Sequence, residues 1–193
     1  MSESATMTLP NYFKRLNDYF PEQELKHPEQ LEDLVKHASV YKKLEDEQFL
    51  ILYAEFPNFL FVDYLLVSSK IRGKGIGTKV MKRLQSQGKP IVLEVEPEDP
   101  AEPDSIKRRK FYSRHGFHEA NGVIYRRKDP KGNPFDMDIL LWTPDGKTEA
   151  DDESAYEMMT QVCEHVHNFH AKEYYGKMPA DPNKVLSLET VAN

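Results

Sequence analysis

A glycine-rich segment between a predicted strand and a predicted helix constrains the fold of this chain more than any other feature. The segment is Arg72-Gly73-Lys74-Gly75-Ile76-Gly77. It follows an apolar, β-prone run from Phe59 to Val67, and it precedes a helical stripe of Val80, Met81 and Leu84. Backbone N–H groups at a helix start point outward, the helix dipole favours an anion there, and glycines let the ligand approach closely. The order strand, glycine loop, helix therefore predicts an α/β chain with an anion-binding site at the loop.

Two common nucleotide-binding patterns match this loop poorly. A Walker loop needs a glycine, four residues and then Gly-Lys-Ser/Thr, whereas the fifth residue after Gly73 is Thr78. The dinucleotide fingerprint needs glycine or alanine where Thr78 stands, and it should follow the first strand of a βαβ unit. The loop is therefore a weak candidate for either kind of nucleotide site.

The strand before the loop belongs to a predicted hairpin. Phe49 to Glu55 is apolar, Pro57-Asn58 breaks the run, and Phe59 to Val67 resumes it. Strict alternation puts Phe59, Phe61, Asp63, Leu65 and Val67 on one face and Leu60, Val62, Tyr64 and Leu66 on the other. Because both faces are mostly apolar, we expect a central strand that is covered on both sides.

The remaining elements follow from periodicity and from proline and glycine positions. The predicted helices are Asn11 to Phe20, Glu29 to His37 after Pro28, a helix after the glycine loop that ends near Gly88, and Ile106 to His115 with Ser105 as its cap. The predicted strands are Ile91 to Val95, Val123 to Arg126 and Phe135 to Trp142.

The C-terminal part predicts one long helix. Ala155, Met159, Val162, Val166 and Phe169 recur at steps of four and three residues from Glu153 to Tyr175. Such a stripe is too apolar to remain in water, and we expect the helix to pack on the chain's own core. We therefore divide the chain into a domain of residues 1–150 and a helical extension of residues 151–193, with a loose tail after Gly176.

Two motifs at the expected separation resemble the GNAT superfamily of N-acetyltransferases. Arg72-x-x-Gly75-x-Gly77 after a strand ending in Val67 resembles the family's motif A. Phe111-Tyr112-Ser113-Arg114-His115-Gly116-Phe117 resembles its Tyr-x-x-x-Gly-Phe motif B. The resemblance is best over residues 48–142. It implies an α/β (α+β) fold, with a mixed, mostly antiparallel, twisted central sheet flanked by helices, here with an extra C-terminal helix.

The resemblance also implies acetyl-CoA as the cofactor, used as a co-substrate. Motif A would hold its pyrophosphate, and a backbone N–H near Leu66 or Val67 would polarise the thioester. Basic residues on the two helices suit the phosphates of coenzyme A. Ser105 stands where many members carry an asparagine that contacts the cofactor, so Ser105 either keeps that contact or only caps its helix. The expected cofactor-binding residues are Leu66, Val67, Arg72, Gly73, Lys74, Gly75, Ile76, Gly77, Thr78, Ser105 and Lys110.

The catalytic residues that the resemblance implies are an acid and a base. Tyr112 matches the tyrosine that protonates the leaving thiolate; the alternative is a core aromatic. Asp63 is a candidate base because a carboxylate on an apolar strand is costly to bury, and desolvation would raise its pKa. Glu94 and Glu96 compete with Asp63 for this role, and ion pairs with nearby bases are the alternative for all three. We expect direct attack of the amine in a ternary complex, because no pattern indicates a covalent acyl-enzyme.

The composition limits the partners. The net charge of −6 makes nucleic acid and anionic membrane poor partners. A single cysteine, Cys163, and an acidic N-terminus without a signal pattern favour the cytoplasm. The acceptor amine, on a small molecule or a protein, stays open, and so does the choice between monomer and homodimer. The alternative to an active enzyme is a catalytically weak acyl-CoA-binding or regulatory module.

A metal site is a weaker hypothesis. Cys163, His167 and His170 fall on one face of the predicted C-terminal helix. No fourth ligand stands at a recognisable spacing, and the same helix carries a complete apolar stripe. We therefore predict no metal site and assign these side chains to a half-exposed helical face.

Overall fold

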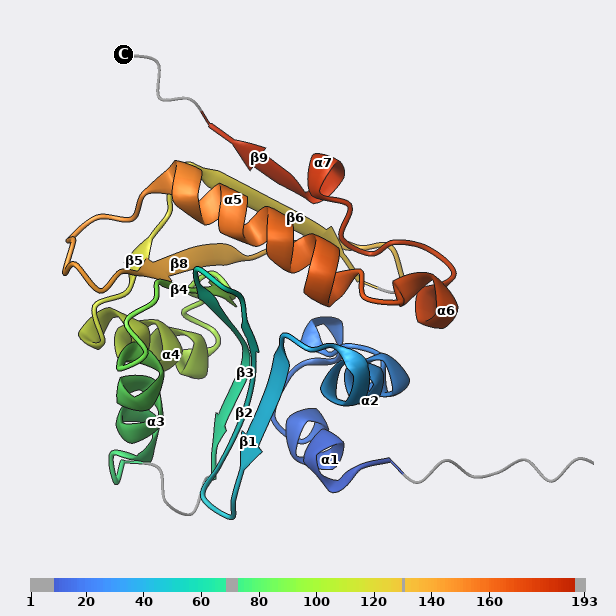
Figure 1. Cartoon of the computed structure of the whole chain (residues 1–193), viewed down its shortest axis with the longest axis horizontal. Helices are drawn as coiled ribbons and strands as arrows, with labels where there is room; N and C mark the ends of the chain where they lie inside the picture. The colour runs from blue at the N-terminus through green and yellow to red at the C-terminus, as the bar shows by residue number, and fades with distance from the viewer. Residues whose placement is uncertain (1–8, 69–72, 130, 190–193) are drawn as a thin grey trace, which may run out of the picture.

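The computed structural model describes residues 9–68, 73–129 and 131–189, and its centre is a six-stranded sheet (Figure 1). The strand order is β1-β2-β3-β4-β8-β5. All neighbours are antiparallel except β3 and β4, which run parallel. This arrangement confirms the expected mixed, mostly antiparallel sheet. The strands are β1 (Tyr41–Glu45), β2 (Phe49–Glu55), β3 (Leu60–Val67), β4 (Ile91–Val95), β5 (His118–Glu119) and β8 (Asp138–Trp142).

Helices cover both faces of the sheet. On one face, α3 (Ile76–Gln85) and α4 (Pro103–Arg114) pack over a core that includes Met81 and Leu84. On the other face, α1 (Asn11–Asn17), α2 (Pro28–His37) and α5 (Asp152–Val162) enclose a larger core. Figure 1 shows α3 and α4 on the opposite side of the strands from α1 and α2. The central strand β3 is therefore covered on both sides, as its two apolar faces predict.

A β-bulge at Asp63 corrects the predicted alternation of side chains along β3. Leu52 pairs with Tyr64, but the next residue, Tyr53, pairs with Val62, so Asp63 has no partner in the ladder. Beyond the bulge the faces exchange. Tyr64 and Leu66 join Phe59 and Phe61 in the larger core, whereas Leu65 packs with Leu60 and Val62 in the other core.

The bulge also marks where β3 separates from β4. The parallel pairing covers only Leu60–Ile91, Phe61–Val92 and Val62–Leu93. Strand β4 continues to Val95 along β8, while β3 continues to Val67 along β2. The two strands therefore diverge after Val62, and a gap opens between them near the middle of the sheet.

A small second sheet carries the segment after α4. Its order is β7-β6-β9, with β6 at Val123–Lys128, β7 at Pro134–Asp136 and β9 at Leu186–Leu188. The single predicted strand Phe135 to Trp142 is wrong, because the chain bends at Met137. The Met137 N–H donates to the Tyr125 carbonyl, which leaves β7 with β6 and sends β8 into the main sheet.

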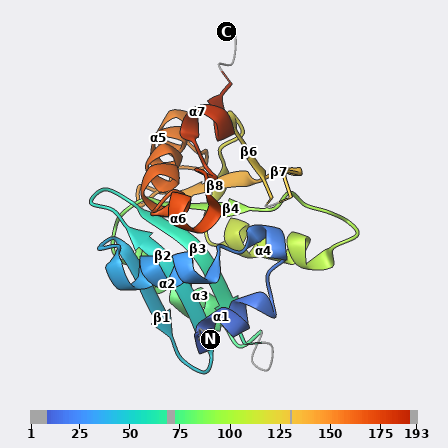
Figure 2. The same ribbon diagram turned by 90° about the vertical axis from the view of Figure 1, so that its right-hand side faces the viewer.

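The predicted continuous C-terminal helix is also wrong. Helix α5 ends at Val162, a π-helical turn follows over Cys163–His167, and His170 has a left-handed φ of 48° before α6 (Ala171–Tyr175). The buried stripe from Ala155 to Val166 nevertheless packs on the chain's own sheets. Figure 2 shows α5 and α6 gathered with α7 (Pro182–Val185) at the end of the molecule away from α1.

The expectation of a loose tail after Gly176 fails for the part of the tail that the structure describes. Leu186 and Leu188 pair with Tyr125 and Val123 of β6. The Asn168 side chain exchanges two hydrogen bonds with the backbone of Ala180, at 2.7 and 3.0 Å. A 3₁₀ turn, Glu22–Glu24, precedes α2 at the other end of the chain. Across the described residues, no helix has both the length and the apolar composition needed to cross a membrane.

Candidate active site

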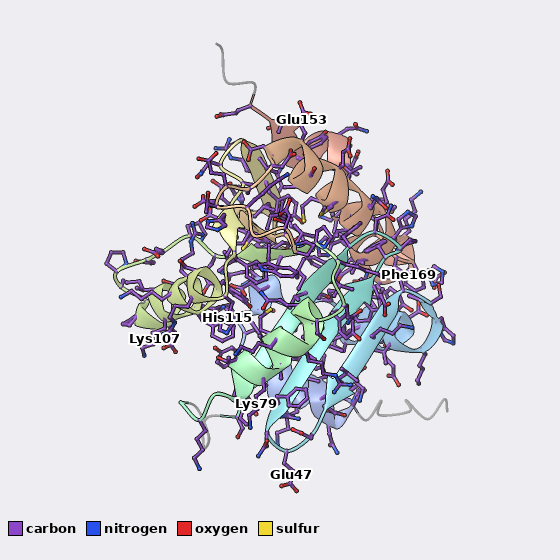
Figure 3. The ribbon with its side chains drawn as sticks, turned by 60° about the vertical axis from the view of Figure 1, so that its left-hand side comes forward. Glu47, Lys79, Lys107, His115, Glu153 and Phe169 are labelled. Atoms are coloured by element: carbon purple, nitrogen blue, oxygen red, sulfur yellow. The ribbon has the colours of Figure 1, made fainter. Side chains whose placement is uncertain are left out.

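A groove of about 520 Å³ lies between the glycine loop and α4. Its walls come from β3, from the start of α3 and from one face of α4. Figure 3 shows Lys79 on α3 and Lys107 on α4, the two helices that border the groove. The groove is lined by Tyr19, Leu65, Val67, Gly73, Gly75, Ile76, Gly77, Thr78, Asp104, Lys107, Arg108, Phe111, Tyr112 and Arg114.

The start of α3 has the geometry of an anion site. Gly73 and Gly75 have positive φ angles of 85° and 76°, which only glycine adopts without strain. The first turn of α3 carries no acidic residue and no side-chain cap, so its N–H groups are not capped by a side chain of the described chain. A Cβ on Gly77 would lie 3.1 Å from the Phe111 ring, so glycine there lets α3 approach α4 closely. Lys107 and Arg114 add positive charge on the α4 side.

Not every expected cofactor residue lines this groove. The groove is lined by Val67 and by five residues of the loop and helix start, which are Gly73, Gly75, Ile76, Gly77 and Thr78. Lys74 is exposed and does not line the groove. Leu66 turns its side chain into the larger core, so only its backbone lies near the groove. Lys110 lines a separate cavity beside Phe117. Arg72 lies outside the described residues.

Ser105 neither caps α4 nor reaches the groove. Helix α4 begins three residues earlier than predicted, at Pro103, so Ser105 lies within its first turn. Its hydroxyl donates to the Glu102 carbonyl at 2.8 Å and accepts from the Asp99 N–H at 3.0 Å. Both contacts fix the proline-rich loop before α4, so the serine has a local structural role.

Tyr112 lies where the groove meets a small central cavity of about 50 Å³ in the gap between β3 and β4. The side chain is 7% exposed, and burial raises the pKa of its phenol well above the usual value. The phenol therefore stays protonated at neutral pH. Leu65 and Arg108 line both spaces as well, so the groove and the central cavity lie side by side.

Asp63 lies in the central cavity as half of a buried ion pair. The Lys26 ammonium donates to both carboxylate oxygens at 2.7 Å, and the Tyr41 hydroxyl donates at 2.5 Å. The side chains of Asp63 and Lys26 are only 5% and 6% exposed. The carboxylate is thus fully engaged by two donors that stand far from it in the sequence.

Glu94 also lies in the central cavity, against a residue from the C-terminal π-helical turn. His167 is 2% exposed, and its Nε2 lies 2.6 Å from the Glu94 carboxylate. Burial alone would raise the pKa of Glu94, but His167, Arg127 and Lys26 outweigh it and lower the pKa to about 2. Burial lowers the pKa of His167 despite this carboxylate. The Nε2 atom therefore faces the carboxylate, and Nδ1 is left buried with no hydrogen-bond partner in the described chain.

Glu24 and Glu96 share the guanidinium of Arg108. The Arg108 Nη1 lies 2.9 Å from Glu96 and 3.9 Å from Glu24. Burial, reinforced by the charges of Glu96 and Glu94, raises the pKa of Glu24 to about 7, although Arg108 opposes the shift. The Tyr64 hydroxyl accepts from the Lys26 N–H and donates to the Glu24 carbonyl, which fixes this segment against β3. Glu24 is therefore a carboxyl group that titrates near neutral pH inside the cavity.

Sequence reasoning missed Glu24, Lys26, Arg127 and His167, all of which line the central cavity. Glu24 and Lys26 stand in a short turn without a motif, and Arg127 belongs to an ordinary strand. His167 stood out only as a possible metal ligand. In the structure His167 faces Glu94, His170 contacts Asp33, and no cluster of metal-ligating side chains forms within the described residues.

Comparisons with known proteins decide the family. The model of the acetyltransferase (GNAT) domain matches residues 31–119. The Bacillus subtilis (strain 168) protein YjbC, which is named as a putative acetyltransferase, is 39% identical over 180 residues, with 92% of each chain covered. The chain belongs to the GNAT superfamily of acetyltransferases. A solved GNAT-family structure from Bacteroides thetaiotaomicron superposes with a TM-score of 0.61 at 22% identity, covering 80% of this chain and 92% of that one, and it supports the fold.

The GNAT domain match has limits that matter for the site. It includes the glycine loop, Tyr112, Asp63, Glu94 and Glu96, and it ends at residue 119. Acetyl-CoA is the acyl donor of the family, and the groove at the start of α3 fits a ligand with phosphates. The match does not reach Glu24, Arg127 or His167, which line part of the central cavity.

Proposed function

We propose that this protein transfers the acetyl group of acetyl-CoA to a primary amine by direct attack. One observation carries the proposal: the groove at the start of α3 adjoins a cavity, in the gap between β3 and β4, that is lined by both an acid and a candidate base. The glycine loop would bind the pyrophosphate, and Lys107 and Arg114 would attract the other phosphates. The pantetheine arm would then follow Leu65 and Val67 towards Tyr112.

The backbone of β3 beyond the bulge offers donors for the thioester carbonyl. Residues 63–67 have no pairing with β4. The Ser68 N–H donates to Gln48, and N–H direction alternates along a strand, so the N–H group of Leu65 faces the gap rather than β2. An N–H on this edge would stabilise the oxyanion that forms when the amine attacks.

Among the carboxylates that line the central cavity, Glu24 has the surroundings that best suit a general base. Asp63 is held by Lys26 and Tyr41, and Glu94 is held ionised by His167 with a pKa of about 2. Glu96 lies closest to Arg108, whereas Glu24 has a pKa of about 7, in the range where a base both accepts and releases a proton. In the reaction the amine nitrogen bonds to the carbonyl carbon, Glu24 takes its proton, the C–S bond breaks, and Tyr112 protonates the thiolate.

The C-terminal extension, residues 151–193 in our division of the chain, would complete the site of the domain formed by residues 1–150. It supplies His167 from the π-helical turn. The buried Gln30 amide of α2 donates to the His167 and Phe169 carbonyls at 3.0 Å and so fixes this turn against α2. The extension would therefore shape the acceptor side of the site without touching the glycine loop.

The test is a screen of amine acceptors with acetyl-CoA, following release of free thiol, with acetyl-CoA binding measured separately by calorimetry. Turnover with at least one amine, small or on a peptide, together with micromolar binding supports the proposal. Tight binding with no turnover across the panel would instead favour an acyl-CoA-binding or regulatory module. Absence of acetyl-CoA binding would overturn the assignment of the groove.

A further inference from the structure

A third cavity adjoins the central cavity on the side of the C-terminal segment. This acceptor pocket has a volume of about 360 Å³ and lies between the N-terminal segment before α2, the end of β6 and the chain after α6. It shares Glu24, Lys26, Arg127 and His167 with the central cavity. The groove joins the central cavity through other residues, Leu65, Arg108 and Tyr112, so the acceptor pocket is a separate route to the proposed base.

The acceptor pocket carries more positive than negative charge. Its lining has three carboxylates, from Glu24, Asp129 and Asp181, and twice as many cations. Three of the cations have acidic partners: Lys26 pairs with Asp63, Arg126 with Asp136, and Lys184 with Asp181. No ion pair forms, within the described part of the chain, for the other three cations, which are Arg127, Lys128 and Lys177. A ligand with a negative group therefore complements this pocket.

Arg127 is the unpaired cation nearest the proposed chemistry, because it alone of these three also lines the central cavity. Its Nε is buried without a hydrogen-bond partner, and its guanidinium lies 6.0 Å from the centre of the Phe135 ring. The Glu94 carboxylate, which interacts with it electrostatically, already accepts from His167. A buried Nε–H without a partner is costly, and an anion that accepts from it would remove this cost.

We propose that the acceptor pocket binds a small molecule that carries a carboxylate as well as the primary amine, and that Arg127 holds this carboxylate. The inference rests on the proposed acetyl transfer, because the amine must reach Glu24 from the same pocket. A planar guanidinium matches a carboxylate through two parallel hydrogen bonds. A phosphate dianion would place two negative charges beside Glu24 and Glu94, where Arg127 is the unpaired cation that lines both cavities. A carboxylate, with a single negative charge, therefore fits better. Lys128 and Lys177 at the outer part of the pocket attract the anion during approach.

The test compares matched acceptors that differ only in the anionic group. Straight-chain ω-amino acids of three to six carbons are compared with their methyl esters, the plain alkylamines and the corresponding aminoalkylphosphonates. We expect kcat/KM to be about 10- to 100-fold higher for the best amino acid than for its ester, as for a charge-assisted bidentate contact. Equal kcat/KM values, or a preference for the phosphonate, would overturn the inference.

The Arg127→Gln variant tests the residue itself. It should lose the preference for the carboxylate, mainly through a higher KM for the amino acid, and bind acetyl-CoA like the parent protein. Arg127→Lys should regain part of the preference. Arg83→Gln, an exposed change on α3, is the matched control and should change nothing. A preference that survives in Arg127→Gln would overturn the assignment.

A binding measurement separates the two proposals. Calorimetry with coenzyme A present tests N-acetylated ω-amino acids, the expected products, against the parent and Arg127→Gln. This measurement requires no turnover. Loss of binding only in Arg127→Gln supports the pocket even if no amine is acetylated, and in that case it is the proposed activity that fails. Equal binding to both proteins overturns the pocket.

Discussion

The carboxylates around the central cavity differ in their hydrogen-bond partners and therefore in the roles that they can take. Asp63 accepts from an ammonium and a phenol, and Glu94 accepts from an imidazole. Both are therefore held by donors. Glu24 lies instead between other carboxylates, 3.9 Å from a guanidinium that is closer to Glu96. Its pKa of about 7 follows from burial and like charge, which are the conditions that tune a carboxyl group towards base catalysis.

Replacing Glu24 should change the pH dependence of turnover. A base with a pKa of about 7 must lose its proton to act, so kcat/KM of the parent should rise with pH up to about pH 7. Glu24→Gln should lower kcat by about 10²-fold and remove this rise. Glu22→Gln, an exposed change in the same turn, should keep the parent profile. An unchanged profile in Glu24→Gln would return the role to Glu96 or to water.

The same substitution should raise stability at high pH. The folded-state pKa of Glu24 is above its unfolded value, so its contribution is full below pH 4.5 and is lost as the pH rises through about 7. Glu24→Gln should therefore match the parent's free energy of unfolding at pH 4 and exceed it by up to about 3 kcal/mol at pH 8. Denaturant unfolding at the two pH values measures the difference.

Asp63→Asn should act on folding rather than on the pH profile. The change leaves the ammonium of Lys26 buried without its counter-ion, which costs about 3–5 kcal/mol. The double variant Lys26→Met, Asp63→Leu should regain much of this loss, whereas the exposed Asp18→Asn should have no effect. Thermal unfolding measures stability, and a shifted acidic limb in Asp63→Asn would show that Asp63 is the base after all.

Tyr112→Phe should remove the proton donor and little else. The ring is buried against Phe111 and Phe117, and phenylalanine keeps these contacts. We expect kcat to fall by about 10²-fold while the Kd for acetyl-CoA changes little. Stopped-flow measurement of thiol release and calorimetry separate the two quantities. Equal turnover in both proteins would make Tyr112 a core aromatic.

At the scale of elements, the approach of α3 to α4 defines the groove. Gly77 is the contact point, because a Cβ there would lie 3.1 Å from the Phe111 ring. Among the described residues, no atom lies within 4 Å of such a Cβ on Gly73 or Gly75, and these two positions need glycine for their backbone angles instead. The glycines of one loop are therefore required for two different physical reasons.

Gly77→Val should weaken acetyl-CoA binding by pushing α4 away from α3. We expect Kd to rise by about tenfold or more, since a misplaced backbone loses contacts with the pyrophosphate. Adding Phe111→Leu should restore part of the affinity by making room for the valine. Gly88→Ala, at a turn outside the groove, serves as the control for a lost glycine. A parent-like Kd in Gly77→Val would show that the loop does not hold the phosphates.

At the scale of the whole molecule, the chain after residue 151 closes the site as well as the core. Ala155, Met159, Val162 and Val166 are completely buried, and β9 pairs with β6. The Tyr175 hydroxyl accepts from the His27 N–H and donates to Gln30, which joins α6 to the start of α2. The segment before α2 and the segment from α6 onward therefore meet around the acceptor pocket.

Deleting the chain after Asp151 should give an aggregating or unstable protein. The deletion exposes apolar area worth several kcal/mol at about 25 cal/mol per Å². A shorter deletion, after Gly176, removes α7 and β9 and should raise the KM for the acceptor more than the Kd for acetyl-CoA. Light scattering and thermal unfolding compare the three proteins. A monomeric, equally heat-stable product of the longer deletion would contradict the structure.

The sequence by itself determined the elements whose signals are local. The apolar run from Phe59 to Val67, the glycines after it and the spacing to Tyr112 were enough to predict the hairpin, the helix α3 and the family. Each of these depends on neighbours in the chain: turn residues, a helix start, or a motif of seven residues. The predicted groove residues Gly73, Gly75 and Gly77 accordingly line one groove in the structure.

Only the tertiary structure decided which side chains line the central cavity and how their surroundings set their pKa values. The bulge at Asp63 reverses the faces of β3, and no local pattern marks it, because it depends on the register with β2. The π-helical turn aims His167 at Glu94, which is 73 residues away in the sequence. The pKa of Glu24 depends on Glu96 and Arg108, which two other elements bring beside it. Burial and charge are properties of the assembled neighbourhood, so they appear only once distant segments have packed together.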